Sequence, residues 1–386
     1  MFLKIPETID KTLKKLENNG FEAYIVGGCV RDLLLKKNPS DYDITTNALP
    51  NEVKLIFDKT VDTGIKHGTV TVIENNIPIE ITTYRTENGY SDTRRPDSVS
   101  FVSNLNEDLS RRDFTVNAMC YNPKSGLIDL FGGTDDLNNK RLKAVGNAEK
   151  RFSEDALRIM RLFRFSSVLD FKIENETFNA ALKCKDLLKN ISVERISLEL
   201  IKAICGKNPE NFAPLINSNA LEFLEIFPTH NLNLLKDIKE NNLKIFYFLI
   251  FSQNNFNLIK KLRLSNDIKN YCENLDKMLG MNIPENKKDV KKMLSVFDNK
   301  IFSDYLDFTQ NCLKYDVSNI RIMFDEIIKN NEPYKIEQLL INGDDLIKAG
   351  YKGKDIGEKL KFALSDVINN PSHNKKDILM NKIQSN

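Results

Sequence analysis

Residues Gly27 to Ile44 read GGCVRDLLLKKNPSDYDI, and this stretch carries the most information about the fold. The preceding run, Phe21 to Val26, is apolar and β-prone, while Val30 to Leu35 is rich in helix formers. The glycine pair therefore lies at a predicted strand-to-helix turn. Backbone N–H groups are unpaired at such a turn and can bind phosphate oxygens, which makes Gly28 a candidate phosphate contact.

Two carboxylates follow the turn. Asp41 and Asp43 are two residues apart, so in a strand both would point to one face and could share hard cations such as Mg²⁺. Two-metal phosphoryl chemistry needs this arrangement. Taken separately, a Gly-Gly turn is usually only a turn and an Asp-x-Asp pair is usually a solvated face. Their combination in one strand–helix–strand pattern favours a functional site.

Two further segments are rich in arginine. Residues 109–119 read LSRRDFTVNAM, which alone is compatible with an amphipathic helix that buries Phe114 and Met119. Residues 153–164 read SEDALRIMRLFR, where an acid and three arginines recur every three residues along one predicted helix face. The alternative there is a surface pair between Asp155 and Arg158, which would contribute little stability.

In this order the motifs resemble the signatures of polymerase-β-type nucleotidyltransferases, specifically the class II bacterial tRNA nucleotidyltransferase and poly(A) polymerase group. The resemblance implies that Asp41 and Asp43 are catalytic and bind two Mg²⁺ ions. Glu80, on a predicted strand, is a third candidate ligand, although a cross-strand or solvated role fits it equally well. It also implies a set of nucleotide-binding residues: Gly28, Arg31, Arg112, Asn117, Asp155, Arg158, Arg161 and Arg164.

Within that set, the resemblance assigns the triphosphate to Arg112, the ribose and local loop geometry to Asn117 and Asp113, and the base to Asp155 and Arg158. A carboxylate accepts from the exocyclic amine of cytosine or adenine, and a guanidinium donates to the neighbouring ring acceptor. Uracil and guanine present the wrong group at that edge. The protein itself would then select CTP and ATP.

The function implied is addition or repair of the 3′-terminal CCA of tRNA from CTP and ATP, without a nucleic-acid template. Residues 85–97, which include Arg94 and Arg95, resemble the flexible loop of family members that add the terminal A. Three alternatives remain: an A-adding enzyme that works with a CC-adding partner, a poly(A) polymerase, and a noncatalytic RNA-binding protein on the same scaffold.

The expected fold is an α+β catalytic head with a mixed sheet, followed by an elongated all-α neck, body and tail. Strand signals occupy roughly the first 140 residues, and helical patterns dominate from about Glu149 onward. We predict a head over 1–140, a neck with base recognition over 141–208, a body over 209–284 and a tRNA-binding tail over 285–386. In the tail, Lys352 and Lys354 flank a glycine turn that could contact RNA phosphates, or form an ordinary capped turn.

Composition is consistent with this interpretation. The net charge is only +2, but only Arg263 and Arg321 follow Arg195, so nucleotide recognition is expected in the N-terminal half. The six cysteines show no close pairing, which favours a reducing cytoplasm over a disulfide framework. No apolar run is long enough to span a bilayer, so no membrane partner is predicted. The predicted partners are tRNA, CTP and ATP, and no oligomeric state is favoured.

Overall fold

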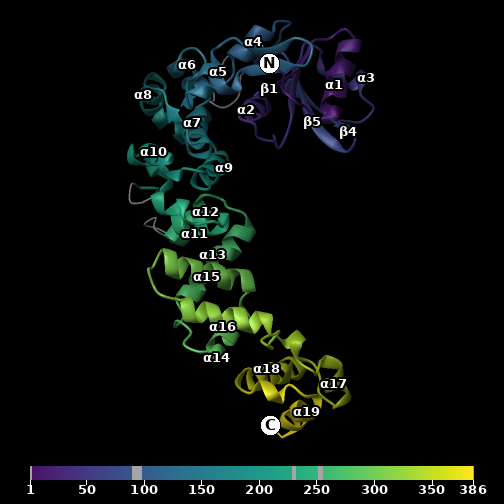
Figure 1. Ribbon diagram of the computed structural model, residues 1–386, viewed down its shortest axis with the longest axis vertical. Coiled ribbons are helices and arrows are strands. Elements are labelled where there is room, and N and C mark those ends of the chain that lie inside the picture. The colour runs from purple at the N-terminus through teal and green to yellow at the C-terminus, as the bar shows by residue number, and fades with distance from the viewer. Residues whose placement is uncertain (1, 89–97, 228–231, 251–254, 386) are drawn as a thin grey trace. The chain divides into compact units, whose positions relative to one another are not determined.

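The computed structural model of the chain describes residues 2–88, 98–227, 232–250 and 255–385 (Figure 1). It divides into two compact units. The first unit comprises Met1–Lys236 and Phe248–Arg263, and the second comprises Asp237–Tyr247 and Leu264–Asn386. Helix α11 (Asn241–Ile250) contributes residues to both. Within the described ranges, no helix is both long enough and apolar enough to cross a membrane.

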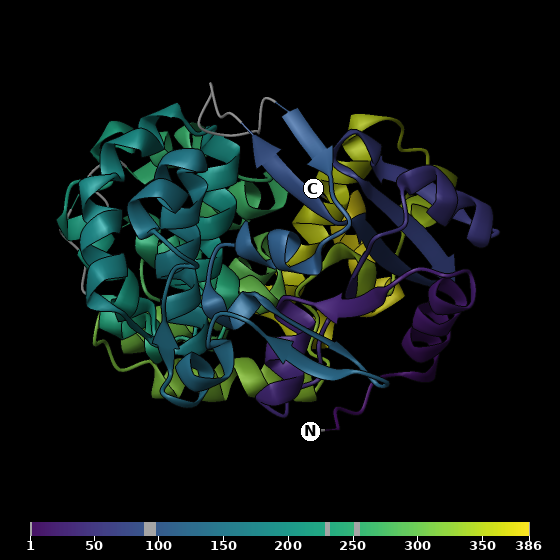
Figure 2. The same ribbon diagram turned by 90° about the horizontal axis from the view of Figure 1, so that it is seen from above.

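The first unit contains a seven-stranded mixed sheet in the order β3-β4-β5-β2-β1-β8-β9. Only the β2–β5 pair is parallel, and the other neighbours in the sheet are antiparallel. Figure 2 shows these strands side by side, with the purple helix α1 next to them. The strands are β1 (Ala23–Val26), β2 (Asp43–Thr46), β3 (Thr60–Gly64), β4 (Thr69–Glu74), β5 (Ile77–Thr83), β8 (Met119–Asn122) and β9 (Gly126–Asp129). Two smaller sheets pair β6 (Arg85–Asn88) with β7 (Ser98–Phe101) and β10 (Arg141–Leu142) with β11 (Lys172–Ile173).

Local sequence explains the elements at one side of this sheet. Ile9, Leu13 and Leu16 recur at helical spacing and are almost completely buried on α1 (Glu7–Asn18). The β4–β5 hairpin turns through Asn75 and Asn76, whose φ angles are 51° and 62°. Two successive left-handed residues match the twist of a two-residue hairpin, and asparagine tolerates that conformation.

The remaining helices of the first unit flank and follow the sheet. They are α2 (Gly28–Leu34), α3 (Pro50–Ile56), α4 (Leu105–Ser110), α5 (Gly133–Asn138), α6 (Ala148–Glu154), α7 (Leu157–Leu169), α8 (Asn175–Lys183), α9 (Val193–Ile204), α10 (Ala213–Asn217) and α12 (Asn255–Lys261).

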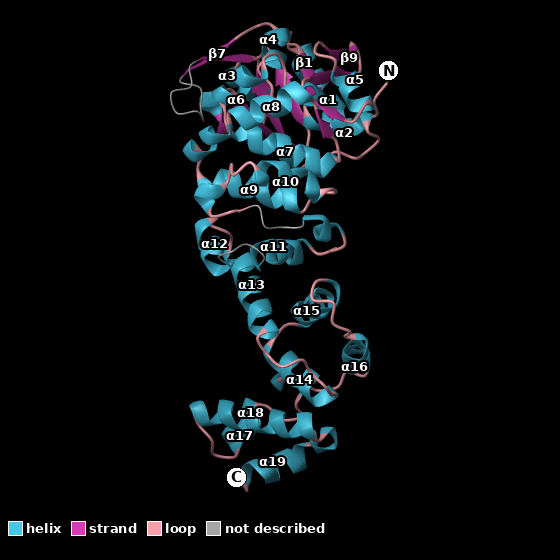
Figure 3. Ribbon diagram, turned by 90° about the vertical axis from the view of Figure 1, so that its left-hand side faces the viewer, coloured by secondary structure: helices cyan, strands magenta, loops and turns pink. Residues whose placement is uncertain are grey.

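The secondary structure elements in the described residues of the second unit are all helices, joined by loops (Figure 3). Several of its helices begin at a side-chain cap, such as Ser265 before α13 and Asn286 before α14. Its helices are α13 (Asn266–Leu279), α14 (Lys287–Val296), α15 (Asn299–Asn311), α16 (Ser318–Lys329), α17 (Gly343–Lys348), α18 (Lys354–Asn369) and α19 (Lys376–Gln384). The predicted α+β head followed by helices is thus confirmed. The four domain boundaries stay predictions.

One local interpretation is wrong. The arginine-rich segment around residue 112 is not a single amphipathic helix, because α4 ends at Ser110 and is followed by a turn, a short 3-10 helix over Thr115–Asn117 and strand β8. Phe114 and Met119 are nevertheless fully buried. The break places Arg112 in a turn next to the sheet rather than on a helix surface.

Candidate nucleotide and metal site

Gly27 and Gly28 form the turn that joins β1 to α2, here called the phosphate turn. Gly27 lies between them with φ 80° and ψ −128°, a backbone conformation that residues with a Cβ atom avoid. Its N–H donates to the carbonyl of Met119 at 3.1 Å, which ties the turn to the start of β8. Gly28 is the first residue of α2, as expected for a strand-to-helix turn that presents backbone N–H groups.

Only one member of the acidic pair lies in the predicted strand. Strand β2 begins at Asp43, so Asp41 precedes the strand by two residues. Pro39 and Ser40 lie between α2 and the strand, and the hydroxyl of Ser40 donates to Asp41 at 2.9 Å. The partner that the strand does provide is Glu80, which lies opposite Asp43 in the parallel β2–β5 register.

The region around Asp41, Asp43 and Glu80, here called the acidic corner, carries closely spaced negative charge. Although Asp43 is solvent-accessible, partial desolvation by the surrounding protein, together with the carboxylates of Glu80 and Asp41, raises its pKa to about 6. Arg112 acts in the opposite direction. A bound divalent cation would relieve this repulsion, and oxygen donors suit such a cation. The donor set therefore fits a hard metal ion, although no three acidic, histidine or cysteine side chains converge on a common point within the described ranges.

Arg112 lies between this corner and the phosphate turn. Its Nη2 donates to the Asp108 carboxylate at 3.3 Å, and its buried Nε has no hydrogen-bond partner. A Cβ atom at position 27 would lie 3.1 Å from Arg112 Nη1. The guanidinium thus packs directly against the glycine turn, with donor capacity left for a ligand.

A buried chain of polar contacts links several predicted nucleotide-binding residues. Arg31 donates to the side-chain oxygen of Asn117 at 2.8 Å, and the Asn117 amide donates to Asp113 at 3.2 Å. Asp113 also accepts from Arg161 at 2.8 Å. Burial alone would raise the pKa of Asp113, but Arg161 and the Asn117 amide lower it to about 2. Arg31, Asn117 and Arg161 are therefore brought together as one network.

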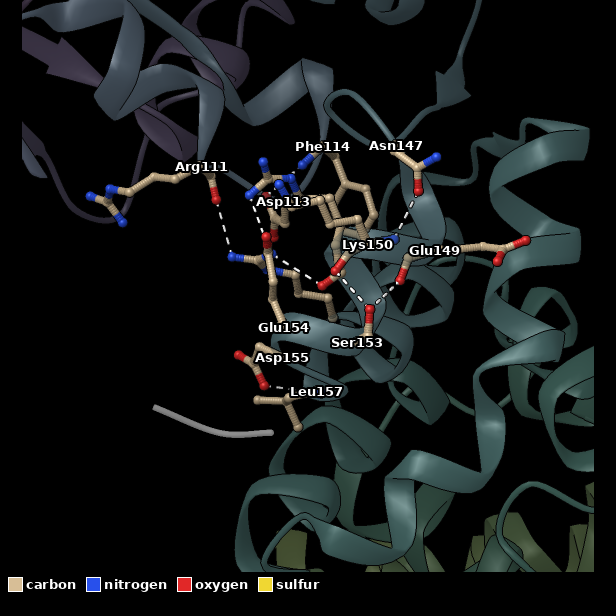
Figure 4. Close-up of polar contacts among 12 residues, drawn as sticks. Arg111, Asp113, Phe114, Asn147, Glu149, Lys150, Ser153, Glu154, Asp155 and Leu157 are labelled. Carbon is tan, nitrogen blue, oxygen red and sulfur yellow. Dashed lines mark hydrogen bonds and ion pairs between the residues drawn. The ribbon is translucent and has the colours of Figure 1, made fainter. Parts of the chain in front are cut away.

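Asp155 does not share a helix face with Arg158, as the three-residue spacing had predicted. Helix α7 begins at Leu157, so Asp155 lies in an extended link and its carboxylate accepts from the Leu157 N–H at 3.1 Å (Figure 4). Its ion-pair partner is Arg195 on α9, at 3.3 Å. Burial raises the pKa of Asp155, and Arg195 opposes that effect.

Arg158 pairs with Glu154 instead, at 2.9 Å, and is almost fully buried. Its Nη2 donates to the backbone carbonyl of Arg111 at 3.0 Å, drawn as a dashed line from the Arg111 oxygen in Figure 4. Arg158 thus joins the start of α7 to the backbone just before Arg112.

The other arginines of α7 also have partners. Arg164 forms an ion pair with Glu199 of α9 and lies over the Phe165 ring at 3.8 Å from its centre. Arg31 and Arg161 lie over the same ring, each at 5.3 Å. Contacts between cations and an aromatic face stabilise this cluster.

Sequence reasoning missed four acids and bases that hold these groups: Asp108, Glu154, Arg195 and Glu199. Asp108 and Glu154 lie four residues before Arg112 and Arg158, so helical spacing could have identified them. Arg195 and Glu199 contact residues 35 to 40 positions away, and no local pattern signals such contacts.

Two predictions concern residues away from this site. Arg94 and Arg95 lie outside the described residues. In the second unit, Gly353 precedes α18 with φ 56°, and both Lys352 and Lys354 are exposed. The glycine-and-lysine turn before a helix is therefore present, and RNA contact there stays a prediction.

Family models match both the sheet-containing region and the helices after it. Residues 23–143 match the model described as poly A polymerase head domain. Residues 170–231 match the model described as probable RNA and SrmB-binding site of polymerase A.

Named relatives extend the similarity along the chain. The CCA-adding enzyme of Ligilactobacillus salivarius (strain UCC118) is 40% identical over 399 residues, which cover 97% of this chain and 96% of that protein. The CCA-adding enzyme of Streptococcus sanguinis (strain SK36) is 54% identical over 213 residues, which cover 55% of this chain and 53% of that protein.

Solved structures share the fold. The crystal structure of the Bacillus stearothermophilus CCA-adding enzyme in complex with CTP aligns with a TM-score of 0.79 and 28% identity, covering 98% of each chain. The Thermotoga maritima CCA-adding enzyme complexed with tRNA aligns with a TM-score of 0.66 and 22% identity, covering 99% of this chain and 96% of that one.

Proposed function

Since this chain belongs to the family of CCA-adding enzymes, it is a nucleotidyltransferase, and we propose that it builds or repairs the CCA end of tRNA from CTP and ATP. The tRNA 3′-hydroxyl attacks the α-phosphorus of the bound nucleotide in line with the leaving group. A new phosphodiester bond forms, the bond to the β-phosphate breaks, and pyrophosphate leaves. The relatives do not favour poly(A) synthesis, an A-only activity or a noncatalytic role.

The nucleotidyltransferase fold implies a divalent metal. In this proposal Asp41 and Asp43 hold two Mg²⁺ ions, with Glu80 as a further ligand. The observation that carries the assignment is the position of Asp43 opposite Glu80 and close in sequence to Asp41. Desolvation of Asp43, together with the negative charges of Glu80 and Asp41, raises its pKa to about 6. When bound, the metal would lower the pKa of the attacking hydroxyl and neutralise charge on the leaving pyrophosphate.

Arg112 and the phosphate turn hold the triphosphate. Arg112 packs against Gly27 and has a buried, unpaired Nε, so its guanidinium can take an additional oxygen ligand. The backbone N–H of Gly28, at the same turn, is a further donor for a phosphate oxygen. Arg31 helps to position the triphosphate and donates at 2.8 Å to Asn117, which supports the ribose. Arg161 and Arg164 help to hold the nucleotide.

Asp155 reads the base. Its carboxylate accepts from the exocyclic amine of cytosine or adenine, and Arg158 donates to the neighbouring ring acceptor. Glu154 and the Arg111 carbonyl hold the Arg158 guanidinium, at 2.9 and 3.0 Å. This support limits the rotation of Arg158, as selection between similar bases requires.

The tRNA contacts are assigned to the helices after the head. The match over residues 170–231 to an RNA-binding family model supports this assignment. Lys352 and Lys354 are proposed contacts to the tRNA backbone because both are exposed beside a helix start. None of the six cysteines, all of which the structure describes, forms a disulfide, and this is consistent with the cytoplasmic location that we propose.

An asparagine at position 43 tests the catalytic assignment. Asp43→Asn keeps the shape of the side chain but removes a metal-binding charge, so incorporation of CMP and AMP into tRNA should fall by about a thousandfold or more. The thermal unfolding midpoint should be unchanged or raised, since the repulsion with Glu80 disappears. Retained incorporation in a folded variant would refute the assignment.

A further inference from the structure

Asp108 is a buried acid to which the proposed mechanism gives no role. It lies on α4 and is 0% exposed. One carboxylate oxygen accepts from Arg111 Nε and Nη2 at 3.0 and 2.7 Å. The other accepts from Arg112 Nη2 at 3.3 Å and from the Thr45 hydroxyl at 3.1 Å.

These contacts connect three separate parts of the site. Thr45 lies two residues after Asp43 on β2, so both side chains point to the same face of the sheet. Arg112 touches Asp108 with one terminal nitrogen, while the other lies against Gly27. The Arg112 guanidinium is therefore held between the strand that carries Asp43 and the phosphate turn.

We propose that Asp108 and Thr45 are positioning residues that fix the Arg112 guanidinium in the orientation that binds the triphosphate. The inference rests on the proposed function, because that function assigns Arg112 to the triphosphate. Asp108 accepts from the Nη2 of Arg112. The Nε of Arg112 is buried and has no hydrogen-bond partner. Thr45 in turn fixes the Asp108 carboxylate from the strand.

A second buried acid provides a matched control. Asp136 is 2% exposed and also accepts from a threonine hydroxyl and an arginine, Thr115 at 2.6 Å and Arg141 at 2.5 Å. These partners, Thr115 and Arg141, belong neither to the phosphate turn nor to the contacts of Arg112. Asp136→Asn should therefore reproduce the loss of a buried carboxylate without affecting the triphosphate site.

The probe is inorganic tripolyphosphate, titrated into the full chain by calorimetry at one fixed Mg²⁺ concentration. Asp108→Asn removes a negative charge near the site, so simple electrostatics predicts tighter binding. Loss of positioning predicts the opposite. We expect the Kd for tripolyphosphate to rise about tenfold, and the KM for CTP and for ATP to rise with it.

Thr45→Val provides an independent variant if Asp108→Asn does not fold. It removes the single hydrogen bond by which Thr45 holds the Asp108 carboxylate and leaves Asp108 itself in place, so the Kd should rise about threefold. Asp136→Asn should lower the unfolding temperature and leave the Kd at the wild-type value. An unchanged or lower Kd in folded Asp108→Asn, or in Thr45→Val when the first variant is unfolded, would overturn the inference.

The same titration separates this inference from the proposed function. If the wild-type chain binds tripolyphosphate but adds no nucleotide to tRNA, the proposed function fails. The comparison of Kd values among the variants would still decide whether Asp108 and Thr45 position Arg112.

Discussion

Gly27 meets two constraints at once. Its φ of 80° and ψ of −128° exclude most side chains, and a Cβ atom would lie 3.1 Å from Arg112 Nη1. The first constraint concerns stability, and the second concerns the site. The two can be separated because Gly126 has the same φ of 80° with no atom within 4 Å of its would-be Cβ.

Alanine substitutions at Gly27 and Gly126 separate the effect of backbone strain from the effect on Arg112. Both Gly27→Ala and Gly126→Ala should lower the free energy of unfolding by about 1–2 kcal/mol, because both strain the backbone. Only Gly27→Ala should also raise the KM for CTP, since it displaces Arg112. Urea unfolding and steady-state kinetics give the two quantities. A raised KM in Gly126→Ala as well would mean that strain alone accounts for the effect.

One carboxylate oxygen of Asp155 forms an ion pair with Arg195 at 3.3 Å, and the other accepts from the Leu157 N–H. A carboxylate can only accept, which suits the amine of cytosine or adenine. An asparagine of the same shape could also donate, and uracil presents an acceptor at that position.

Asp155→Asn should therefore weaken the preference for CTP over UTP by about ten- to a hundredfold, the range of one base contact. The ratio of kcat/KM for the two nucleotides on one tRNA measures this preference. Asp170→Asn, at the opposite end of α7, serves as the control and should keep the wild-type ratio. An unchanged ratio in Asp155→Asn would count against its role in base selection.

At the scale of elements, α7 is joined to the turn after α4 by the pair of Asp113 and Arg161, at 2.7 Å. Asp113 has a folded-state pKa of about 2, below its ordinary value of 3.8. A carboxylate with a lowered pKa stabilises the fold fully above about pH 4 and loses that contribution as the pH falls toward 2.

The pH dependence of Asp113→Asn follows from this pair. Wild type should exceed the variant in free energy of unfolding at pH 7, because the variant leaves Arg161 without its counter-charge. That difference should shrink by about 2 kcal/mol between pH 5 and pH 2. Urea unfolding across this pH range measures the difference in unfolding free energy between the two proteins. A difference that does not change with pH would contradict a lowered pKa for Asp113.

The elements were predictable where their signal is local. Ile9, Leu13 and Leu16 recur at helical spacing and lie on α1, and two successive asparagines mark the turn of the β4–β5 hairpin. The sequence around Arg112 is compatible with an amphipathic helix, but the buried residues Phe114 and Met119 belong to a turn and a strand. Tertiary packing decided between these conformations.

Individual side chains of the site were predictable, but their partners within the protein were not. The motifs pointed to Asp155 and Arg158 as base-reading residues on one helix face, whereas in the structure Asp155 forms an ion pair with Arg195, 40 residues away. A helix start at Leu157 causes the difference, since it takes Asp155 out of helical spacing with Arg158. Helix boundaries are the least certain feature of a local pattern.

At the scale of the whole molecule, nucleotide chemistry and tRNA binding are assigned to different parts of the chain. The carboxylates and Arg112 lie in the first unit, and Lys352 and Lys354 lie in the second. Replacing both lysines with alanine should weaken tRNA binding and reduce the steepness of its salt dependence by about one per lost phosphate contact. The KM for CTP should not change.

The control for this variant is Lys288→Ala combined with Lys292→Ala. These lysines are also exposed in the second unit and remove the same charge. Filter binding at several salt concentrations compares the two double variants. Equal losses in both would show that net charge, rather than the turn at Gly353, determines the affinity.

The most direct test of the central claim is to sequence the 3′ ends of a tRNA that lacks CCA after incubation with the purified chain and CTP, ATP or both. A CCA-adding activity predicts that CTP alone adds two cytidines and that both nucleotides together complete CCA and stop. A run of adenosines from ATP alone, or addition of A only to a tRNA that already ends in CC, would contradict it.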